Sequence, residues 1–325
     1  MKDENWWLVA DIGGTNARFW GVTPGSIEPV WQGYYLVNEY PEFADVLTHA
    51  LQDVAVALDA NVSPQKVCFA VACPTVLDRF VFTNSHWNFT IEEVIEKTGC
   101  SLVSVINDFG SVARAVPKLK VPDLTPVGDG QISSKHPKVV LGAGTGLGVA
   151  GLVPSVTGFS VIESEGGHAD YAPVGDLQVE VKRKLRSQFK RVCIERVLSG
   201  PGLINVSNAL AAIKHQPPRF TTPAEIVAAA LSDQDELALE VLDFFCDVAG
   251  AVAGNLALTF GAKGGVYIVG GVIPRFSDYF LRSGFRSAFE DKGRFRNYLA
   301  NISVFLVQRQ DLGLIGAVTY LSEEV

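Results

Sequence analysis

The sequence contains few cysteines, and none of them are spaced as a zinc site or a redox pair requires. The five cysteines are scattered through the 325 residues, at Cys68, Cys73, Cys100, Cys193 and Cys246. No two are separated by only two residues, which is the usual spacing of zinc ligands. An odd number without a regular framework favours a reducing compartment. The N-terminus carries Asp3 and Glu4 and lacks the cationic start of a secretory signal, so we expect a cytoplasmic protein.

Basic residues and long apolar runs are also scarce. The chain has 27 Lys and Arg against 35 Asp and Glu, a net charge of −8. A nucleic-acid-binding surface needs clustered basic residues, and the one basic run, 182–191, is typical of the exposed face of a helix. The most membrane-like segment, 244–262, is interrupted by Asp247 and Asn255 and indicates a buried helix. We therefore expect neither nucleic acid nor a membrane as a partner.

The composition that remains is that of a globular protein. Hydrophobic residues make up 48% of the chain and charged residues 19%, and the length allows two domains with substantial cores. In the first third, apolar runs at 30–37, 67–72 and 102–106 predict strands. Helices are predicted from Pro41 and from Thr90, where Glu93 completes a capping box. Strands alternating with helices indicate an α/β layer.

The stretch 8–19, LVADIGGTNARF, predicts a strand, a tight glycine turn and a second strand. Gly13 and Gly14 leave the amide groups of the turn open to an anion, and Thr15 and Asn16 add side-chain donors. Asp11, at the end of the first strand, is placed to hold a cation or its bound waters. These groups suit a metal-bound polyphosphate. The alternative is a hairpin whose glycines serve only the backbone geometry.

A second stretch, 138–153, repeats this theme. An apolar strand runs into GAGTGLG, which contains Gly144 and Thr145, and an apolar run follows. The repeat suggests an internally duplicated fold with one phosphate-facing turn in each domain. Neither copy is a P-loop, because no Gly-Lys-Ser/Thr follows, and the second does not fit the dinucleotide fingerprint.

The rest of the chain is predicted to be mostly helical. The segment 117–137, rich in Pro, Gly, Asp and Ser, is expected to be a surface loop. Helices are predicted at 177–189, 201–213, from Thr222 and Pro223, and at 236–260. Strands are predicted at 266–269 and 302–307. A last helix, 312–321, is expected to return and pack on the first domain.

Two groups of residues outside the turns have the side chains that a phosphoryl transfer to an alcohol needs. Asp108, with Asn107, follows a strand end and can take the proton of an attacking hydroxyl, although such a pair also serves as a turn or helix cap. Glu165, His168 and Glu195 can hydrogen-bond a polyol, with an ordinary histidine as the alternative for His168. They match no metal-binding motif.

Taken in order, the motifs resemble those of the bacterial-type glucokinases, in the superfamily of hexokinase, actin and heat-shock-chaperone ATPases. The resemblance extends from Leu8 to the last helix and includes LVADIGGTNARF, INDF, LGAGTGLGV, EGGHADYAP, ERVLSGPGL, GGVYIVGGVIPRF and FEDKGRF. It implies an α/β, two-domain, actin-like (ribonuclease H-like) ATPase fold with a cleft. The small domain would be 1–108 plus 308–325 and the larger α+β domain 109–307. The zinc motif of the related repressors and sugar kinases is absent, as is a helix-turn-helix extension.

The resemblance also implies an activity and a site. The activity would be ATP-dependent phosphorylation of D-glucose at its 6-hydroxyl, in a homodimer, with Asp108 as the catalytic base. The residues that hold glucose would be Asn107, Asp108, Glu165, His168 and Glu195. Those that serve ATP would be Asp11, Gly13, Gly14, Thr15, Asn16, Gly144, Thr145, Gly270 and Gly271, with Asp11 facing Mg²⁺ through water.

Two alternatives remain. One is a kinase of the same fold acting on another sugar or acid. The other is a non-catalytic nucleotide-binding protein of the actin or chaperone kind, against which Asp108 and the Glu165/His168 pair argue.

Overall fold

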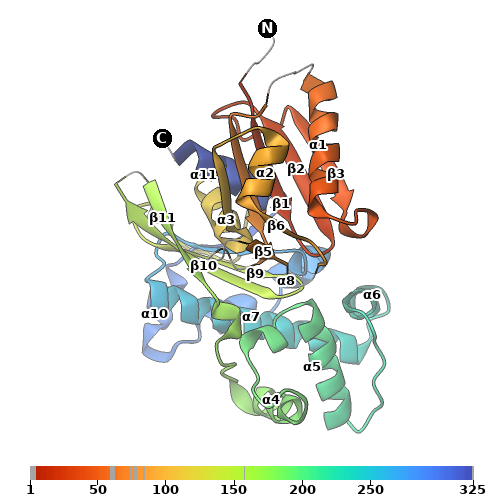
Figure 1. Ribbon diagram of the computed structural model, residues 1–325. Coiled ribbons are helices and arrows are strands. Elements are labelled where there is room, and N and C mark those ends of the chain that lie inside the picture. The colour runs from red at the N-terminus through yellow and green to blue at the C-terminus, as the bar shows by residue number, and fades with distance from the viewer. Residues whose placement is uncertain are drawn as a thin grey trace. The chain divides into compact units, whose positions relative to one another are not determined.

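The computed structural model describes residues 5–58, 63–73, 75, 79–82, 85–156 and 158–323, so Asp3 and Glu4 lie outside the described residues. The chain divides into two compact units, drawn in Figure 1: unit 1 is Met1–Leu119 with Arg309–Val325, and unit 2 is Lys120–Gln308. Each unit has a hydrophobic core of its own. The division expected from the sequence, 1–108 plus 308–325, differs from this one at residues 109–119 and at Gln308, because helix α3 (Asp108–Ala115) packs against other elements of unit 1.

Unit 1 is built on a five-stranded sheet with the order β3-β2-β1-β4-β7. The strands are β1 (Trp7–Ile12), β2 (Asn16–Val22), β3 (Trp31–Leu36), β4 (Lys66–Val71) and β7 (Val103–Asn107). The first three are antiparallel neighbours, and β1, β4 and β7 run parallel. The predicted opening hairpin is confirmed, because Asp11 pairs with Arg18 and Ile12 with Ala17. A small separate hairpin joins β5 (Arg79–Val81) to β6 (Asn88–Thr90).

The helices of unit 1 are α1 (Phe43–Leu58), α2 (Ile91–Thr98), α3 and α11 (Leu312–Glu323), with short 3-10 helices η1 (Val37–Glu39) and η2 (Val116–Lys118). The capping box of Thr90 and Glu93 is confirmed at the start of α2. The return of the last helix is confirmed too: α11, dark blue in Figure 1, packs against α3, β1 and β4. At the closest approach, a Cβ on Gly316 would lie 1.7 Å from the Ser111 carbonyl oxygen, so only glycine fits there.

Unit 2 is built on a six-stranded sheet with the order β11-β10-β9-β12-β13-β8. The strands are β8 (Leu124–Pro126), β9 (Lys138–Ala143), β10 (Leu147–Ser155), β11 (Gly158–Ser164), β12 (Val266–Val269) and β13 (Val304–Val307). From β11 to β13 their order and directions repeat those of β3 to β7 in unit 1. The predicted internal duplication is therefore confirmed at the level of sheet topology.

Two predictions for this sheet need correction. The segment 117–137 is not all loop, because β8 pairs with β13 and adds an edge strand. The strand β11, which the sequence analysis missed, forms the opposite edge; it is mostly exposed and lacks the apolar run that marks a buried strand.

The helices of unit 2 are α4 (Gly175–Phe189), α5 (Gly200–Ile213), α6 (Pro223–Ser232), α7 (Glu236–Phe260), α8 (Ser277–Leu281), α9 (Phe285–Glu290) and α10 (Arg296–Ala300). Short 3-10 helices are η3 (Val121–Asp123), η4 (Gly166–His168), η5 (Ile194–Arg196), η6 (Ile273–Phe276) and η7 (Gly293–Phe295). The long helix α7 is buried along most of its length, as predicted. Across the part of the chain that the structure describes, no helix combines the length and apolarity that crossing a membrane requires.

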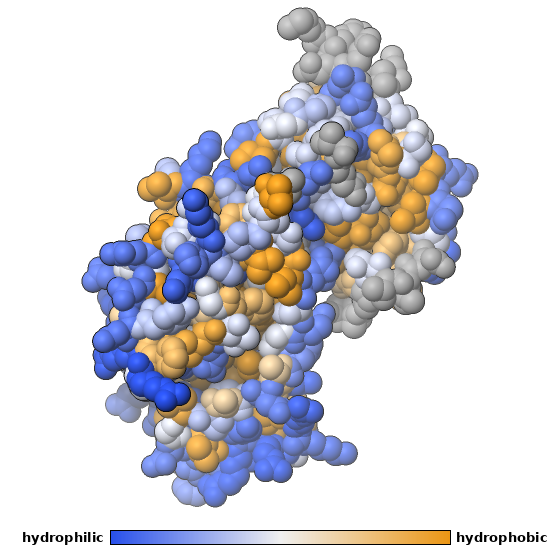
Figure 2. Space-filling view, turned by 90° about the vertical axis from the view of Figure 1, so that its left-hand side faces the viewer, coloured by the Kyte–Doolittle hydropathy of each residue, from blue (hydrophilic) through white to orange (hydrophobic). Residues whose placement is uncertain are grey.

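The surface is of the ordinary globular kind. On the face shown in Figure 2, hydrophilic side chains surround scattered hydrophobic areas. Exposed apolar side chains such as Val174 and Val179 in unit 2 are normal, because apolar atoms contribute more than half of a typical protein surface.

Candidate active site

The first glycine turn is held in shape by hydrogen bonds within unit 1. Gly13 N–H donates to the Asn16 carbonyl oxygen (2.9 Å), and Val37 N–H donates to that of Thr15 (3.0 Å). The Tyr34 hydroxyl donates to Asn16 Oδ1 (2.6 Å). These bonds brace the turn from η1 and β3.

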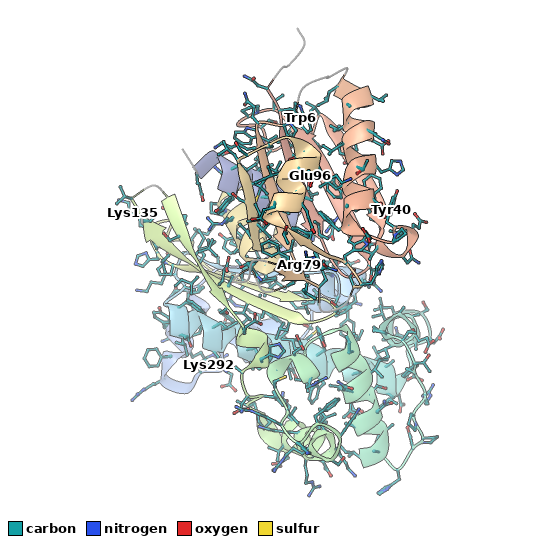
Figure 3. The ribbon with its side chains drawn as sticks, viewed as in Figure 1. Trp6, Tyr40, Arg79, Glu96, Lys135 and Lys292 are labelled. Atoms are coloured by element: carbon teal, nitrogen blue, oxygen red, sulfur yellow. The ribbon has the colours of Figure 1, made fainter. Side chains whose placement is uncertain are left out.

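A cavity of about 590 Å³ opens beside this turn. Its lining includes Gly14, Thr15, Asn38, Ser85 and His86, which bring hydroxyl, amide and imidazole groups, and none of the described residues that line it carries a carboxylate. The carbonyl oxygen of Tyr40, a residue labelled in Figure 3, holds the rings of His86 and Trp87 at 2.9 and 3.0 Å. A carbonyl oxygen only accepts, so His86 donates from Nε2. Such a lining suits an anionic ligand.

Asp11 forms a cross-strand ion pair that the sequence analysis missed. Its Oδ2 accepts from Arg18 Nη2 at 2.6 Å, and Arg18 Nη1 also donates to the Gln310 carbonyl oxygen at 3.1 Å. The hairpin register places the two residues opposite each other, so counting back from the glycine turn could have found the pair. Burial raises the pKa of Asp11, while the charge of Arg18 and its hydrogen bond act in the opposite direction.

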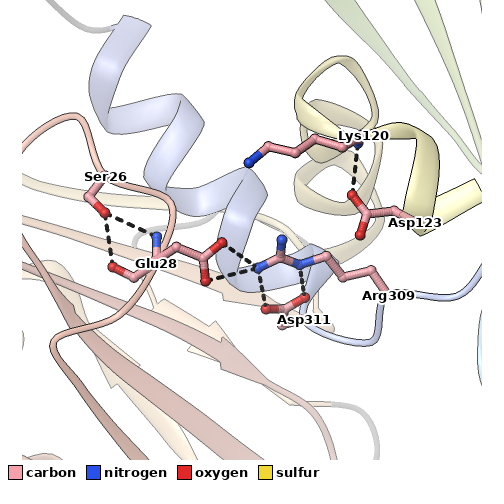
Figure 4. Close-up of polar contacts among 6 residues, drawn as sticks. All are labelled: Ser26, Glu28, Lys120, Asp123, Arg309 and Asp311. Carbon is pink, nitrogen blue, oxygen red and sulfur yellow. Dashed lines mark hydrogen bonds and ion pairs between the residues drawn. The ribbon is translucent and has the colours of Figure 1, made fainter.

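The carboxylate of Asp11 also lies against the start of α11. A Cβ on Gly313 would be 2.8 Å from Asp11 Cγ, so glycine is needed for this approach. The helix start is fixed by Arg309, which pairs with Asp311 at 2.7 Å and with Glu28 at 3.3 Å, as Figure 4 shows. The N-terminus of a helix favours a nearby negative charge, which partly offsets the burial of Asp11.

Asn107 and Asp108 lie where β7 passes into α3. Asn107 Oδ1 accepts from Gly110 N–H (2.8 Å) and caps the helix, and Asp108 Oδ1 accepts from Phe109 N–H (2.7 Å). The alternative interpretation as a helix cap is thus confirmed for Asn107. It does not exclude contact with a substrate, because the cap uses the carbonyl oxygen and leaves the amide nitrogen outside that bond. Parallel pairing of β1, β4 and β7 puts Asp108 at the same edge of the sheet as the first turn.

The second glycine turn lies at the corresponding edge of the unit 2 sheet. Gly144 N–H donates to the Gly146 carbonyl oxygen (2.9 Å), and Gly200 N–H donates to that of Gly144 (2.8 Å). Leu147 N–H donates to Glu195 Oε2 at 2.9 Å. Glu195, predicted for sugar binding, therefore contacts the turn predicted for phosphate binding, a connection that sequence reasoning missed.

Glu165 and His168 lie in the same region of unit 2. Glu165 precedes η4 and His168 is its last residue, and η4 packs on β10 and on η5, the short helix that carries Glu195. A Cβ on Gly167 would lie 2.2 Å from the Leu147 carbonyl oxygen, so glycine allows η4 to approach the turn. The side chains of Glu165 and His168 are exposed. The structure thus brings together the three unit 2 residues predicted to bind sugar.

The Gly270–Gly271 pair follows β12, next to the second turn. Gly270 has a φ of 92°, and a Cβ there would lie 2.4 Å from the Ala143 carbonyl oxygen. Gly271 is exposed, and a Cβ there would have no atom within 4 Å. The first glycine is therefore required by the fold, whereas the second leaves space for a ligand.

The described side chains offer no resident metal site: among them, no three His, Cys, Asp or Glu residues are grouped so as to hold an ion. Asp11 is a single carboxylate already bonded to Arg18 through Oδ2. That arrangement fits a Mg²⁺ ion delivered by a phosphate ligand, which typically keeps several waters and needs only one or two carboxylates.

Solved structures place the fold among the sugar kinases. A glucokinase from an Antarctic psychrotroph matches with a TM-score of 0.88 and 33% identity, covering 98% of this chain and 99% of that one. A glucokinase from Balamuthia mandrillaris matches with a TM-score of 0.77 and 20% identity, covering 98% and 94%. The fold is the two-domain, actin-like ATPase fold of these kinases.

The sequence relatives are more specific. The family model described as Glucokinase matches residues 8–324. A glucokinase of Marinobacter nauticus is 44% identical over 317 residues, 98% of this chain and 97% of that protein. One of Tolumonas auensis is 41% identical over 320 residues, 98% and 97%. The chain belongs to the glucokinase family.

Proposed function

We propose that this protein is an ATP-dependent glucokinase that transfers the γ-phosphoryl group of ATP to the 6-hydroxyl of D-glucose. The observation that carries the proposal is the position of Asp108 at the same edge of the unit 1 sheet as the Gly13–Asn16 turn. A proton acceptor and a set of phosphate-binding amides thus share one edge in a member of the glucokinase family.

The chain's own groups have separate roles in this proposal. Asp108 accepts the proton of the glucose 6-hydroxyl. The oxygen of that hydroxyl bonds to the γ-phosphorus of ATP while the bond between the γ-phosphorus and the ADP oxygen breaks. Glucose hydroxyls are held by Asn107 and Asp108 in unit 1 and by Glu165, His168 and Glu195 in unit 2. The turn residues Gly13, Gly14, Thr15, Asn16, Gly144 and Thr145 hold phosphates, and Gly270 and Gly271 lie along the adenosine.

Asp11 would hold, through water, a Mg²⁺ ion bound to ATP, and that ion would supply charge neutralisation at the phosphates. The Arg18 bond orients the Asp11 carboxylate for that task, since it fixes Oδ2 and leaves Oδ1 outside the bond. The glucokinase of Streptomyces griseus crystallised with glucose and AMPPNP shares this fold at 18% identity, which bears on the fold alone.

The test is a coupled assay of ADP formation with MgATP against a panel of sugars. We expect glucose to give the highest kcat/KM. Preference for a different sugar or a sugar acid would favour the alternative kinase. Nucleotide binding without any sugar-dependent ADP would favour the non-catalytic protein and overturn the proposal.

The proposal includes a homodimer in the cytoplasm. The dimer rests on the resemblance to other glucokinases, and the location on the scattered cysteines. Sedimentation velocity across a concentration series tests the first, and cell fractionation the second.

A further inference from the structure

Two hydrogen bonds tie the second glycine turn to the segment that carries Glu195. Leu147 N–H donates to Glu195 Oε2 (2.9 Å), and Gly200 N–H donates to the Gly144 carbonyl oxygen (2.8 Å). The segment between them is also fixed, because the Ser199 hydroxyl donates to the Glu195 carbonyl oxygen (2.7 Å). The turn, η5 and the start of α5 therefore form one hydrogen-bonded ring.

Glycine at position 146 leaves the space that the Glu195 carboxylate occupies. A Cβ on Gly146 would lie 2.6 Å from Glu195 Oε2, well inside contact distance. Gly146 does not adopt the positive φ that favours glycine, so its backbone conformation is open to other residues. The space over Gly146 is thus occupied by the carboxylate, and the turn and Glu195 fit together as one piece.

We propose that Glu195 is a positioning residue for the nucleotide as well as a ligand of the sugar, so that glucose binding strengthens nucleotide binding through the second turn. This inference rests on the proposed function. A carboxylate has two oxygens with about four acceptor positions. Oε2 can therefore keep the Leu147 N–H while Oε1 accepts from a sugar hydroxyl.

The coupling has a physical basis in the hydrogen bond that joins Glu195 to Leu147. A sugar hydroxyl that donates to Oε1 favours the position of the Glu195 carboxylate in which Oε2 accepts from Leu147 N–H. The turn amides are then held in the arrangement that a phosphate binds, so the sugar favours the state to which the nucleotide binds better. The effect must be reciprocal, so nucleotide strengthens glucose binding by the same factor.

The experiment is calorimetric titration of the full-length protein with MgADP, in the absence of glucose and at saturating glucose. We expect glucose to lower the Kd for MgADP about five-fold or more, the lower end of typical coupling. In Glu195→Gln the acceptor of the Leu147 N–H loses its negative charge, which weakens that hydrogen bond. The factor by which glucose lowers the Kd for MgADP should then fall below about two-fold. The matched control is Glu165→Gln, which removes a second predicted sugar ligand from the neighbouring η4. It should weaken glucose binding yet keep the wild-type factor once glucose saturates.

Gly146→Ala provides an independent variant, because its methyl group displaces the Glu195 carboxylate from Leu147 N–H while every predicted sugar ligand keeps its chemical identity. It should lose the coupling as Glu195→Gln does. If Gly146→Ala fails to fold in a thermal scan, the comparison of Glu195→Gln with Glu165→Gln still decides. A general loss of stability would not change the ratio of two Kd values measured on the same folded variant.

Three results would overturn the inference. One is a Glu195→Gln variant in which glucose lowers the Kd for MgADP by the wild-type factor. Another is a Glu165→Gln variant in which that factor falls as far as in Glu195→Gln. A wild-type protein that binds and phosphorylates glucose without any coupling would overturn the inference and leave the proposed function standing. A wild-type protein that binds MgADP but not glucose would overturn both.

Discussion

The two glycine turns occupy the same place in duplicated sheets, but the carboxylate beside each turn comes from a different part of the chain. Between paired strand ends, the first turn spans Gly13–Asn16 and the second Gly144–Gly146. Beside the first, the carboxylate of Asp11 comes from the hairpin itself and is balanced by Arg18 across the strands. Beside the second, the carboxylate comes from Glu195, 48 residues beyond the Leu147 amide that it accepts from.

This difference shows how a duplicated fold can divide its tasks. A carboxylate on the hairpin is positioned by its own strand and by Arg18 on the next one, which suits an ion that travels with phosphate. A carboxylate brought in from a distant segment connects the turn to that segment. The first arrangement fixes a charge, and the second links two parts of a site.

The comparison extends to the strand ends, and the largest expected effect lies there. In unit 1, β7 is followed by Asp108, whereas the matching β13 in unit 2 is followed by the amide Gln308. Asp108→Asn makes unit 1 like unit 2 at this point. It keeps the size but cannot accept the hydroxyl proton, so turnover should fall by about two to four orders of magnitude.

Steady-state kinetics with calorimetric glucose titration tests this, and glucose affinity should change only modestly. The control is Gln308→Ala, which loses a 3.0 Å bond to Thr125 and should keep turnover within about two-fold. Near wild-type turnover in Asp108→Asn would show that Asp108 is not the base.

A smaller effect separates the two glycines beside the second turn. Gly270→Ala forces a positive φ on alanine and drives its methyl group into the Ala143 carbonyl, so unfolding should be easier by about 2–4 kcal/mol. Gly271→Ala has open space and should unfold like the wild type. Thermal and urea unfolding measure both variants. Equal stability of the two would contradict the distinction drawn here between fold and ligand requirements.

The Asp11–Arg18 pair should contribute an intermediate amount with a definite pH dependence. Arg18→Gln leaves the largely buried Asp11 carboxylate, whose side chain is 17% exposed, without its partner, which should cost about 1–2 kcal/mol at pH 7. Burial raises the folded-state pKa of Asp11, so the fold loses stability as pH rises and the buried carboxyl ionises. The positive charge of Arg18 reduces this loss of stability. The deficit should therefore be largest at neutral pH and shrink toward about pH 4.

Urea unfolding across this pH range tests the prediction. Arg79→Gln removes an exposed pair with Glu93 in the same unit and should cost less than about 0.5 kcal/mol. A deficit for Arg18→Gln that grows on acidification would mean that Arg18 acts through packing and not through the charge of Asp11.

The smallest expected difference concerns helix caps. In unit 1, α3 is capped by the neutral amide of Asn107, whereas in unit 2, α7 is capped by Asp235, whose Oδ1 accepts from Ala238 N–H at 3.0 Å. Asp235→Ala should cost about 1 kcal/mol at pH 7, and Asp235→Asn a few tenths. The Ala238 hydrogen bond and Arg219 lower the pKa of Asp235, so this stability is present above the usual carboxyl pKa and lost as pH falls below it. Thermal scans at pH 7 and pH 3 should show a smaller alanine deficit in acid.

The features that the sequence predicted best are those that depend on neighbours in the chain. Apolar runs ending in glycines identified β1, β9 and β12, and local capping signals identified the starts of α2 and α6. The return of α11 was predictable because its apolar residues and Gly316 need a partner to pack against. In each case the signal lies within one segment.

The features that the sequence did not predict depend on pairing across distance. The edge strands β8 and β11 carry no continuous apolar run, because one of their sides faces solvent. The contact of Arg18 with Asp11 follows only from the hairpin register. The contact of Glu195 with Leu147 depends on a turn far earlier in the chain. Within each unit the site residues share one sheet edge, which strand direction alone implies. The bond between Glu195 and Leu147 required the fold.

The position of α11 also sets the order in which the molecule can be made. Unit 2 is continuous in the chain, whereas unit 1 needs α11, which is synthesised after all of unit 2. Until then the surfaces of α3, β1 and β4 that α11 covers stay open on the nascent chain. Domains fold as units during synthesis, so unit 2 can mature first and unit 1 last. The strands and helices of unit 1 that precede unit 2 in the chain therefore depend on a helix that follows it, and the carboxylate of Asp11 meets α11 only after unit 2 has been synthesised.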